Sequence, residues 1–440
     1  MKRTLLLLGL LTCLPVCGAD RPNVILILAD DFGYECVGAH GGISYQTPNL
    51  DKLAAGGMRF DFAYAQPLCT PTRVQLMTGQ SNIRNYTHFG ELEPSQTTFA
   101  HHFRKAGYVT GIAGKWQLGG GFEGPGHFGF DEYCLWQLTR RPSRYPNPGL
   151  EINGKEVDCT GGKYGPDVVN DYVLDFIARQ KAKPFLLYYP MMLTHDPFVP
   201  TPDSAEWNPE AVNEGKGRKL KHFADMTAYM DKLVGSVVAA LEKNGLREKT
   251  LILFTGDNGT GTAVTSKMGV RSVRGGKGSS KDNGIHVPLI ANWPGTIAPG
   301  RVCNDMVDST DYLPTMCAAA GISIPEGPFM DGRSFMPQLR GEPGQPREWA
   351  YCWYAREGGA KAQFEFAHDQ RFKHYRDGRL YDLAADIDEQ NPLPASENLD
   401  VRQKLQAGLD HFRDARPAAI AAQGGGKIQG KGKKAGPKVE

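Results

Sequence analysis

The sequence lacks several features that mark common classes of protein. Its cysteines form no CxxC pair and no tight cysteine–histidine cluster, which argues against a zinc site. No internal apolar run approaches the roughly 20 residues of a membrane-spanning helix, so no transmembrane segment is expected. Once the two ends of the chain are set aside, acidic residues slightly outnumber basic ones. The body therefore lacks the positive charge that a nucleic-acid partner requires.

The chain instead has a globular composition, with 440 residues of which 40% are hydrophobic and 22% are charged. That apolar content is too high for general disorder. The length exceeds the ~250–300 residues at which one core usually stops growing, so we expect more than one unit. The pattern of residues changes after Pro337, which predicts a large domain over 20–337 and a small subdomain over 338–415. A disordered basic tail is expected over 416–440.

The first nineteen residues predict export. Two basic residues precede the apolar stretch Leu5–Leu11, which is the pattern of a cleaved signal peptide over 1–19. We therefore expect a periplasmic or secreted protein. A lipid anchor at Cys17 is a weaker alternative, because Pro15 and Val16 fit a lipoprotein cleavage box poorly. Seven cysteines follow this leader, and an odd number in an oxidising compartment suggests one with a separate role.

Short apolar runs alternate with helical patterns along the body, as in an α/β protein whose mostly parallel sheet is flanked by helices. Such runs predict strands at Asn23–Ala29, Tyr108–Ala113, Pro184–Tyr189, Thr250–Thr255 and Pro288–Trp293. A short helix is predicted at Pro48–Ala55 with Thr47 as its N-cap, and core-facing helices are predicted over 168–177 and 223–241. Aromatic-rich runs after Pro337 predict a smaller antiparallel sheet, followed by a helix around 399–414.

Reactive side chains follow four of these predicted strands. They are Asp30 and Asp31 after the first, then Lys115 and Gln117, then His195, and then Asp257 and Asn258. Because ligands of open α/β sheets bind beyond the carboxyl ends of the strands, we expect one composite site. A single aspartate at a strand end more often caps a helix. The capping interpretation is weaker here, because two adjacent carboxylates and an Asp-Asn pair from a distant part of the chain are expected at the same edge of the sheet.

The residue types within this set indicate its chemistry. Three carboxylates and an amide oxygen favour Ca²⁺, which tolerates several carboxylates in irregular geometry; they belong to Asp30, Asp31, Asp257 and Asn258. Without a cation these like charges would repel one another. A basic set would surround an oxyanion beside the metal; it consists of Arg73, Lys115, His195 and Lys277. The combination indicates hydrolysis of an anionic ester, either a sulfate or a phosphate.

A motif then identifies a family. Cys69-Thr70-Pro71-Thr72-Arg73, extended by Leu76-Met77-Thr78-Gly79, resembles the C-x-P-x-R signature of type I, formylglycine-dependent sulfatases, which are arylsulfatase-like members of the alkaline phosphatase superfamily. The resemblance extends to Asp30-Asp31, Gly114-Lys115-Trp116 and Asp257-Asn258-Gly259, and it covers roughly residues 21–395. Tyr381-Asp382-Leu383 and the nearby Glu389 look like the C-terminal motif of that family.

The resemblance implies an alkaline-phosphatase-like fold and a modified residue. A maturation enzyme would oxidise Cys69 to formylglycine (3-oxoalanine), whose aldehyde hydrates to a diol. That role would account for the odd cysteine. By the same resemblance, Ca²⁺ would be held by Asp30, Asp31, the modified Cys69, Asp257 and Asn258.

The resemblance also implies roles for the cations. One diol oxygen would attack the sulfur and the other would later expel sulfate. Arg73 would orient the diol, and Lys115 and Lys277 would stabilise the sulfate oxygens. His195 would protonate the leaving oxygen, with Lys277 as a second group that assists it. Gln117 would contribute to substrate binding.

Two departures from the family pattern concern this site. Gln117 stands where the family commonly has a histidine that helps to deprotonate the diol, and an amide cannot act as a base at neutral pH. His286 stands where many relatives have an arginine, and Asp282-Asn283 alters the rim near Lys277. We interpret both departures as differences between subfamilies.

The sequence therefore predicts an exported, calcium-dependent sulfatase acting on a sulfated carbohydrate or a related sulfate ester. Two alternatives remain, namely a phosphonate or phosphodiester hydrolase of the same superfamily and a catalytically silent relative that binds sulfated glycans. The loop Arg140–Tyr145 is either a wall for an anionic glycan or a solvated basic loop. Trp207, His222 and Arg356 are further candidates for lining the pocket.

Overall fold

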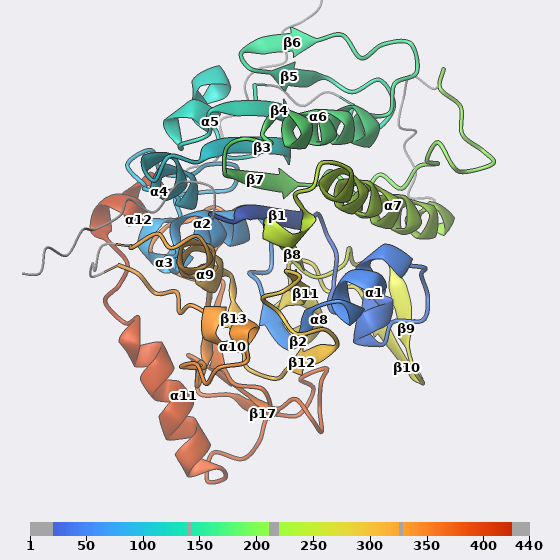
Figure 1. Ribbon diagram of the computed structural model, residues 1–440. Helices are drawn as coiled ribbons and strands as arrows, with labels where there is room; N and C mark the ends of the chain where they lie inside the picture. Colours follow the sequence, from blue (N-terminus) through green and yellow to red (C-terminus); the bar gives the residue numbers. More distant parts are fainter. Residues whose placement is uncertain (1–20, 140–142, 211–219, 325–328, 425–440) are drawn as a thin grey trace, which may run out of the picture.

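The computed structural model describes residues 21–139, 143–210, 220–324 and 329–424. The predicted signal peptide, the possible anchor at Cys17, and residues 425–440 of the predicted tail lie outside these ranges. The described chain is built around a sheet of 11 strands in the order β12-β2-β11-β8-β1-β7-β3-β4-β5-β6, with β13 pairing with β2 (Figure 1).

The middle of this sheet is parallel. Strand β1 (Asn23–Ala29) lies between β7 (Phe185–Pro190) and β8 (Thr250–Gly256), and it runs parallel to both. Strand β3 (Val109–Lys115) continues the parallel set beside β7, and β4 (Glu132–Trp136) follows it. All seven residues of β1 are buried. Its uninterrupted apolar sequence therefore reflects helices covering both faces of the sheet.

The edges of the sheet are antiparallel or mixed. On one side, β11 (His286–Asn292) runs antiparallel to both β8 and β2 (Met58–Tyr64). The short strands β12 (Arg301–Cys303) and β13 (Val307–Asp308) run parallel to β2. On the other side, β5 (Leu150–Ile152) and β6 (Lys155–Val157) form an antiparallel extension.

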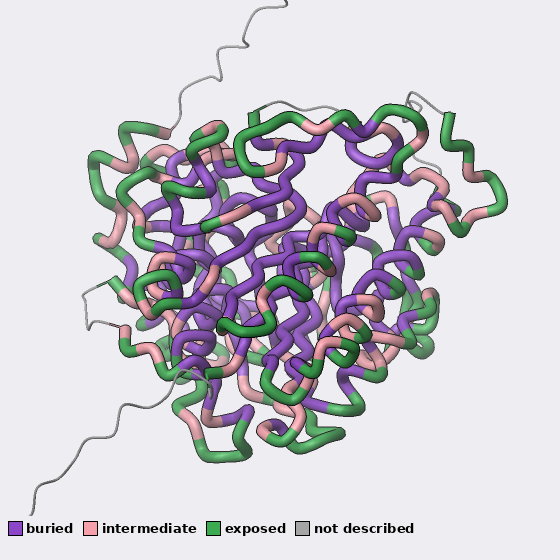
Figure 2. The backbone as a smooth tube through the Cα atoms, turned by 45° about the horizontal axis from the view of Figure 1, so that its top comes forward, coloured by how far each residue is buried: buried purple, intermediate pink, exposed green. Residues whose placement is uncertain are grey.

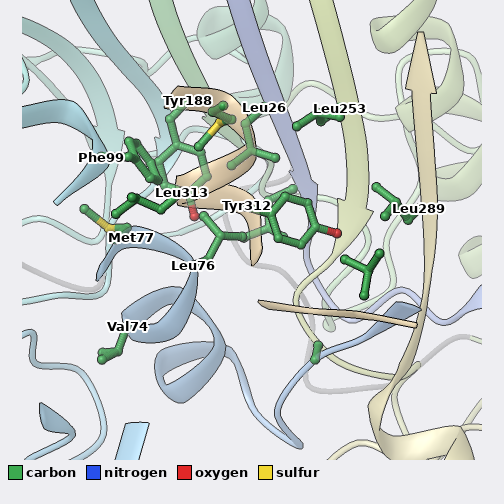
Figure 3. Close-up of a cluster of buried hydrophobic side chains, with 14 of the residues drawn as sticks. Leu26, Val74, Leu76, Met77, Phe99, Tyr188, Leu253, Leu289, Tyr312 and Leu313 are labelled. Atoms are coloured by element: carbon green, nitrogen blue, oxygen red, sulfur yellow. The ribbon is translucent and has the colours of Figure 1, made fainter. Parts of the chain in front are cut away.

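Two helical layers bury opposite faces of the sheet, because successive residues of a strand point to opposite sides. Ile25 and Ile27 face a cluster that includes α1 (Pro48–Ala55), α6 (Gly165–Arg179) and α7 (Lys221–Lys243). Leu26 and Leu28 belong to the other cluster, which includes α2 (Cys69–Thr78), α4 (Phe99–Lys105) and α9 (Tyr312–Ala319) (Figure 3). The buried backbone accordingly runs through the centre of the molecule, and exposed segments form its periphery (Figure 2).

A second, antiparallel sheet follows near the C-terminus. It is built from β14 (Ala350–Tyr354), β15 (Phe364–His368), β16 (Phe372–Tyr375) and β17 (Leu380–Asp382), with α11 (Leu399–His411) packed against it. The remaining short elements are α3 (Asn82–Asn85), α5 (Gly124–His127), α8 (Asp282–Ile285), α10 (Met336–Arg340), β9 (Thr265–Met268) and β10 (Arg271–Arg274).

The observed architecture confirms the predicted fold class, and the five predicted strands are found within two residues of their expected bounds. Helix α1 has the predicted bounds and Thr47 is its N-cap residue, but the Thr47 hydroxyl donates to Asp51 instead of capping the helix. Part of the predicted disordered tail is ordered, because Ala418–Gln423 forms the short helix α12. No helix in the described ranges is long and apolar enough to cross a membrane.

Candidate active site

The ends of β1 and β8 bring the predicted metal ligands together. Ala29 and Gly256 are partners at the ends of these strands, so Asp30 and Asp257 emerge side by side. One ligand atom from each of four residues lies within 4.8 Å of the others; they are Asp30, Asp31, Cys69 and Asp257. All four residues are buried. The structure therefore brings these four residues, which the sequence predicts to belong to one site, together at this sheet edge.

Asn258, the fifth predicted ligand, lies beside this group. Its side-chain amide donates to Asp31 Oδ1 over 2.9 Å and to the Gly259 carbonyl over 2.9 Å. The Asn258 Oδ1 atom is buried and has no hydrogen-bond partner among the described residues. A buried acceptor without a donor carries a desolvation cost, which a bound cation would remove.

Helix α2 places Cys69 in this group. Every residue of the helix is buried, and Cys69 is its first residue. Gly79 ends the helix with a φ of 66°, and a Cβ atom there would lie 2.6 Å from the Met330 sulfur. The motif therefore ends in glycine for a steric reason, because a larger residue at position 79 would collide with Met330. Burial and the nearby Asp257 raise the pKa of the Cys69 thiol to about 12, so the unmodified side chain is a neutral thiol at pH 7.

Three of the predicted cations form ion pairs with these carboxylates. Lys115 Nζ lies 2.8 Å from Asp30, Arg73 lies 3.1 Å from Asp257, and Lys277 Nζ lies 2.6 Å from Asp31. Arg73 also donates to the Lys115 carbonyl over 3.1 Å.

The charge pairs set the ionisation of the carboxylates. Burial opposes the ionisation of Asp30, but Lys115, His195 and Arg144 more than offset it and hold the pKa of Asp30 well below its usual range. Burial and the adjacent Asp30 instead raise the pKa of Asp257 to about 6.

Strand β3 delivers Lys115 to the site through a close backbone contact. Gly114 has a φ of 124°, and a Cβ atom at this position would lie 1.9 Å from the Pro190 carbonyl oxygen. Only glycine fits there without moving β3 away from β7. Beyond the strand, Gln117 has a φ of 56° and is buried, and its Oε1 atom has no partner among the described residues.

His195 lies at the exposed side of the carboxylate cluster. Its Nε2 atom is 3.6 Å from Asp31 Oδ2, and its Nδ1 atom is 2.6 Å from the Asp196 carbonyl oxygen. The Asp196 carboxylate is also 2.9 Å from Nδ1. Asp196 therefore fixes the ring so that Nε2 faces the site.

Sequence reasoning missed the position of Arg144. This residue is buried, donates to Asp30 Oδ2 over 2.7 Å and to the Met192 carbonyl over 3.1 Å, and stacks 4.3 Å over the Trp136 ring. The interpretation of its loop as solvated is therefore wrong for Arg144, because Asp30 compensates its buried charge. Residues 140–142 lie outside the described ranges.

The C-terminal sheet holds the loop that carries Lys277. Lys373 is fully buried, and its Nζ atom donates to the Ser280 carbonyl over 2.7 Å and to Glu389 over 2.8 Å. Tyr375 donates to the Ser280 hydroxyl over 2.9 Å. Glu389 belongs to the predicted C-terminal motif, so that motif fixes a segment three residues from Lys277. We call Ser280, Lys373, Tyr375 and Glu389 the loop clamp.

A cavity of about 530 Å³, the site cavity, opens beside Asp31 and is within the size range of ligand sites. Asp31 and Lys277 line it, together with Tyr354 and Phe364 from β14 and β15 and with Arg356 and Gln363 from the loop between these strands.

Of the other candidates for lining the pocket, only Arg356 does so in the site cavity. Trp207 packs edge-on against Tyr164, and His222 is buried beside Asp225. His286 stacks on Tyr34 with a ring separation of 3.8 Å, and its Nδ1 atom is 3.2 Å from Asp282.

The chain is similar to known sulfatases over most of its length. Residues 22–322 match the Sulfatase family model, and residues 277–415 match the model for the C-terminal region of N-sulphoglucosamine sulphohydrolase. Human arylsulfatase A is 36% identical over 382 residues, which cover 78% of this chain and 72% of the relative. N-acetylgalactosamine-6-sulfatase from Canis lupus familiaris is 31% identical over 360 residues, which cover 74% and 67%.

A solved structure shares the fold. It is described as Ps i-CgsB in complex with k-i-k-neocarrahexaose, and it matches with a TM-score of 0.76 and 27% identity over 90% of this chain and 94% of that one. The expected alkaline-phosphatase-like architecture is thereby confirmed. The family match spans well over half of the chain and includes the carboxylate cluster, Cys69 and the cations around them. The protein therefore belongs to the sulfatase family, whose members hydrolyse sulfuric esters.

Proposed function

We propose that the protein is an exported sulfatase that removes sulfate from a carbohydrate, using a formylglycine derived from Cys69 and a bound Ca²⁺ ion. The observation that carries this proposal is the convergence of Cys69 with three aspartates inside a ring of cations. A carbohydrate substrate is supported by two comparisons, since one relative is named for N-acetylgalactosamine 6-sulfate chemistry and one similar structure holds an oligosaccharide.

The donor set fits calcium. Asp30, Asp31, Asp257 and Asn258 offer only oxygen ligands, and the unpaired Asn258 Oδ1 atom points to a missing electrophile. When bound, Ca²⁺ would neutralise the carboxylates and polarise a sulfate oxygen. Lys115 and Lys277 would then be released from their carboxylate partners to meet the substrate.

The buried Cys69 thiol is a poor nucleophile as it stands, because its pKa of about 12 keeps it protonated. Conversion to formylglycine by a maturation enzyme would supply a hydrated aldehyde oxygen in its place. Arg73, fully buried one helical turn from Cys69, is positioned to orient that oxygen.

The remaining side chains bind charge and move a proton. Lys115 and Lys277 would stabilise the sulfate oxygens, because each is paired with a different aspartate of the carboxylate cluster. A protonated His195 donates Nδ1–H to Asp196 and keeps Nε2–H for the leaving sugar oxygen. Gln117 can hydrogen-bond a sulfate oxygen but cannot remove a proton from the nucleophile.

Mass spectrometry and sulfate release test this proposal together. Protein produced with a maturation enzyme should show the Cys69 peptide as the aldehyde. It should also release sulfate from at least one member of a panel of mono- and oligosaccharide sulfates. The Cys69→Ala variant is the control and should release none. Faster turnover of phosphate diesters than of every sulfate would instead support the phosphodiesterase alternative. Glycan binding without any release by aldehyde-containing protein would support the silent relative.

A further inference from the structure

A second cavity lies beside the site cavity, on the C-terminal sheet. Its volume is about 670 Å³, and we call it the basic cavity because five cationic side chains and only two carboxylates line it. Trp353, Phe364 and Tyr375 also contribute aromatic surface to its lining. No residue of the candidate catalytic group lines this cavity. The positive charge of the basic cavity therefore needs an explanation other than catalysis at the site cavity.

Two of the five cations have no carboxylate partner among the described residues. The other three are neutralised in ion pairs, which are Arg376 with Glu365, Arg379 with Asp377, and Arg413 with Asp410. Lys361 and Arg416 form no such pair. Uncompensated positive charge therefore concentrates at these two positions of the cavity wall.

Arg416 is held in place although it has no counter-ion. Its Nε and Nη1 atoms donate to the carbonyls of Gly359 over 2.9 Å and Ile83 over 3.0 Å, and its guanidinium lies 4.4 Å above the Trp353 ring. The Nη2 atom is buried and makes no hydrogen bond with the described residues. Burial lowers the pKa of Arg416 to about 10. A fixed, partly desolvated guanidinium of this kind is stabilised by an anion.

The basic cavity adjoins the site cavity. Gln363 and Phe364 line both, so a ligand held at one can pass over these two residues into the other. Phe364 stacks on Tyr354 with a ring separation of 4.7 Å, which gives the connecting wall a rigid apolar surface. A flat sugar face can pack on such a surface while its charged groups lie to either side.

We propose that the basic cavity binds a sulfate or carboxylate group on a second sugar of the substrate. The enzyme then prefers a polyanionic oligosaccharide to a monosaccharide sulfate, with Lys361 and Arg416 as the residues that recognise the additional charge. This inference rests on the proposed function for the identity of the chain that enters the site cavity.

Calorimetric binding in the Cys69→Ala background tests this inference without turnover. The probes are a neocarrahexaose and a heparin-derived hexasaccharide, each compared with a monosaccharide sulfate from the same polymer. At least one hexasaccharide should bind ten or more times as tightly as its monosaccharide. The double variant Lys361→Gln/Arg416→Gln should lose about tenfold in affinity for that hexasaccharide. The matched control Arg340→Gln, an exposed arginine outside both cavities, should lose none.

Either of two results would overturn the basic cavity as a glycan site. One is equal affinity of the double variant and its parent for the hexasaccharide, and the other is a parent that binds neither hexasaccharide better than its monosaccharide. Lys361 is exposed, so the single variant Lys361→Gln gives a readout even if replacing Arg416 impairs folding. Turnover of the monosaccharide sulfates by formylglycine-containing protein is measured separately. A failure there refutes the proposed function and leaves the binding result intact.

Discussion

At the scale of single residues, the site is a set of buried charges that neutralise one another. Asp30, for example, is approached by two cations, since Lys115 and Arg144 both lie within 2.8 Å of its oxygens. Burying so many charges costs free energy of folding unless each charge has a partner. Removing one charged side chain therefore leaves its partner buried without compensation. Arg144 thus adds a guanidinium to the basic set expected from the sequence.

We predict that Arg144→Gln lowers kcat/KM for a sulfate ester by about 100-fold, the size of effect seen when a donor that stabilises a transition state is removed. The loss should appear in steady-state kinetics while the circular dichroism spectrum remains that of the parent. Arg59→Gln removes an arginine whose ion pair with Asp61 is at the surface, and it should change the rate by less than twofold. A rate within threefold of the parent for Arg144→Gln would contradict a role in the reaction.

Replacing Gln117 by histidine is expected to increase the activity. Its side chain is buried at the end of β3 with an unpaired oxygen, in the place where the family commonly has a histidine. Gln117→His should raise kcat several-fold, because an imidazole can take up the proton that an amide cannot. Gln117→Asn, which keeps the amide, is the control and should show no gain. Unchanged kcat in the histidine variant would mean that another base already serves.

At the scale of elements, the loop clamp joins the small sheet to the site. Lys373 on β16 donates hydrogen bonds both to Glu389 and to the carbonyl of Ser280. The strand, the C-terminal motif and the loop that carries Lys277 therefore meet at one ammonium group. Glu389 itself has a left-handed backbone with a φ of 53°. The clamp therefore fixes the backbone near Lys277, and none of its four residues lines the site cavity.

We predict that Lys373→Met lowers the free energy of unfolding by about 3–5 kcal/mol, because it leaves Glu389 buried without a counter-charge. The double variant Lys373→Met/Glu389→Gln should recover part of that loss and still show a reduced kcat, since the Ser280 carbonyl remains without its donor. Urea denaturation and sulfate release measure the two effects. Stability losses that simply add in the double variant would show that the two residues do not act as a pair.

The helices and strands also illustrate how much of the fold and of the candidate site can be predicted from the sequence. Continuous apolar runs identified the central strands, since burial on both faces leaves a clear compositional signal. The carboxylates and lysines at the strand ends followed from those strands together with the Cys69 motif. Arg144 and Lys373 could not be placed this way. Each acts through partners that are distant in the chain, and no local pattern encodes such pairings.

At the scale of the whole molecule, stability should depend on pH through buried histidine. Burial, assisted by Lys373, lowers the pKa of His368 to about 4, so the ring stays neutral in the folded protein at mildly acidic pH. The unfolded chain takes up a proton as the pH falls below about 6.5, whereas the folded protein does so only near pH 4. The stability contributed by His368 is therefore present above pH 6.5 and lost as the pH falls to 4.

We expect His368 to account for about 3 kcal/mol of destabilisation between pH 7 and pH 4. His368→Gln should make the urea midpoint less sensitive to pH across this range, although the variant is less stable at pH 7. His411→Gln, a change on the exposed side of α11, is the control. An identical pH dependence in the parent and in His368→Gln would exclude this residue as the cause.

The loop clamp also makes the enzyme sensitive to incomplete synthesis. Every proposed catalytic side chain lies between Asp30 and Lys277, yet the residues that secure the last of them lie at 373–389. A polypeptide that stopped at residue 370 would carry the full set of reactive groups and lack the strand that holds them in register. Prematurely terminated chains are therefore expected to be inactive although no proposed catalytic residue is missing from them.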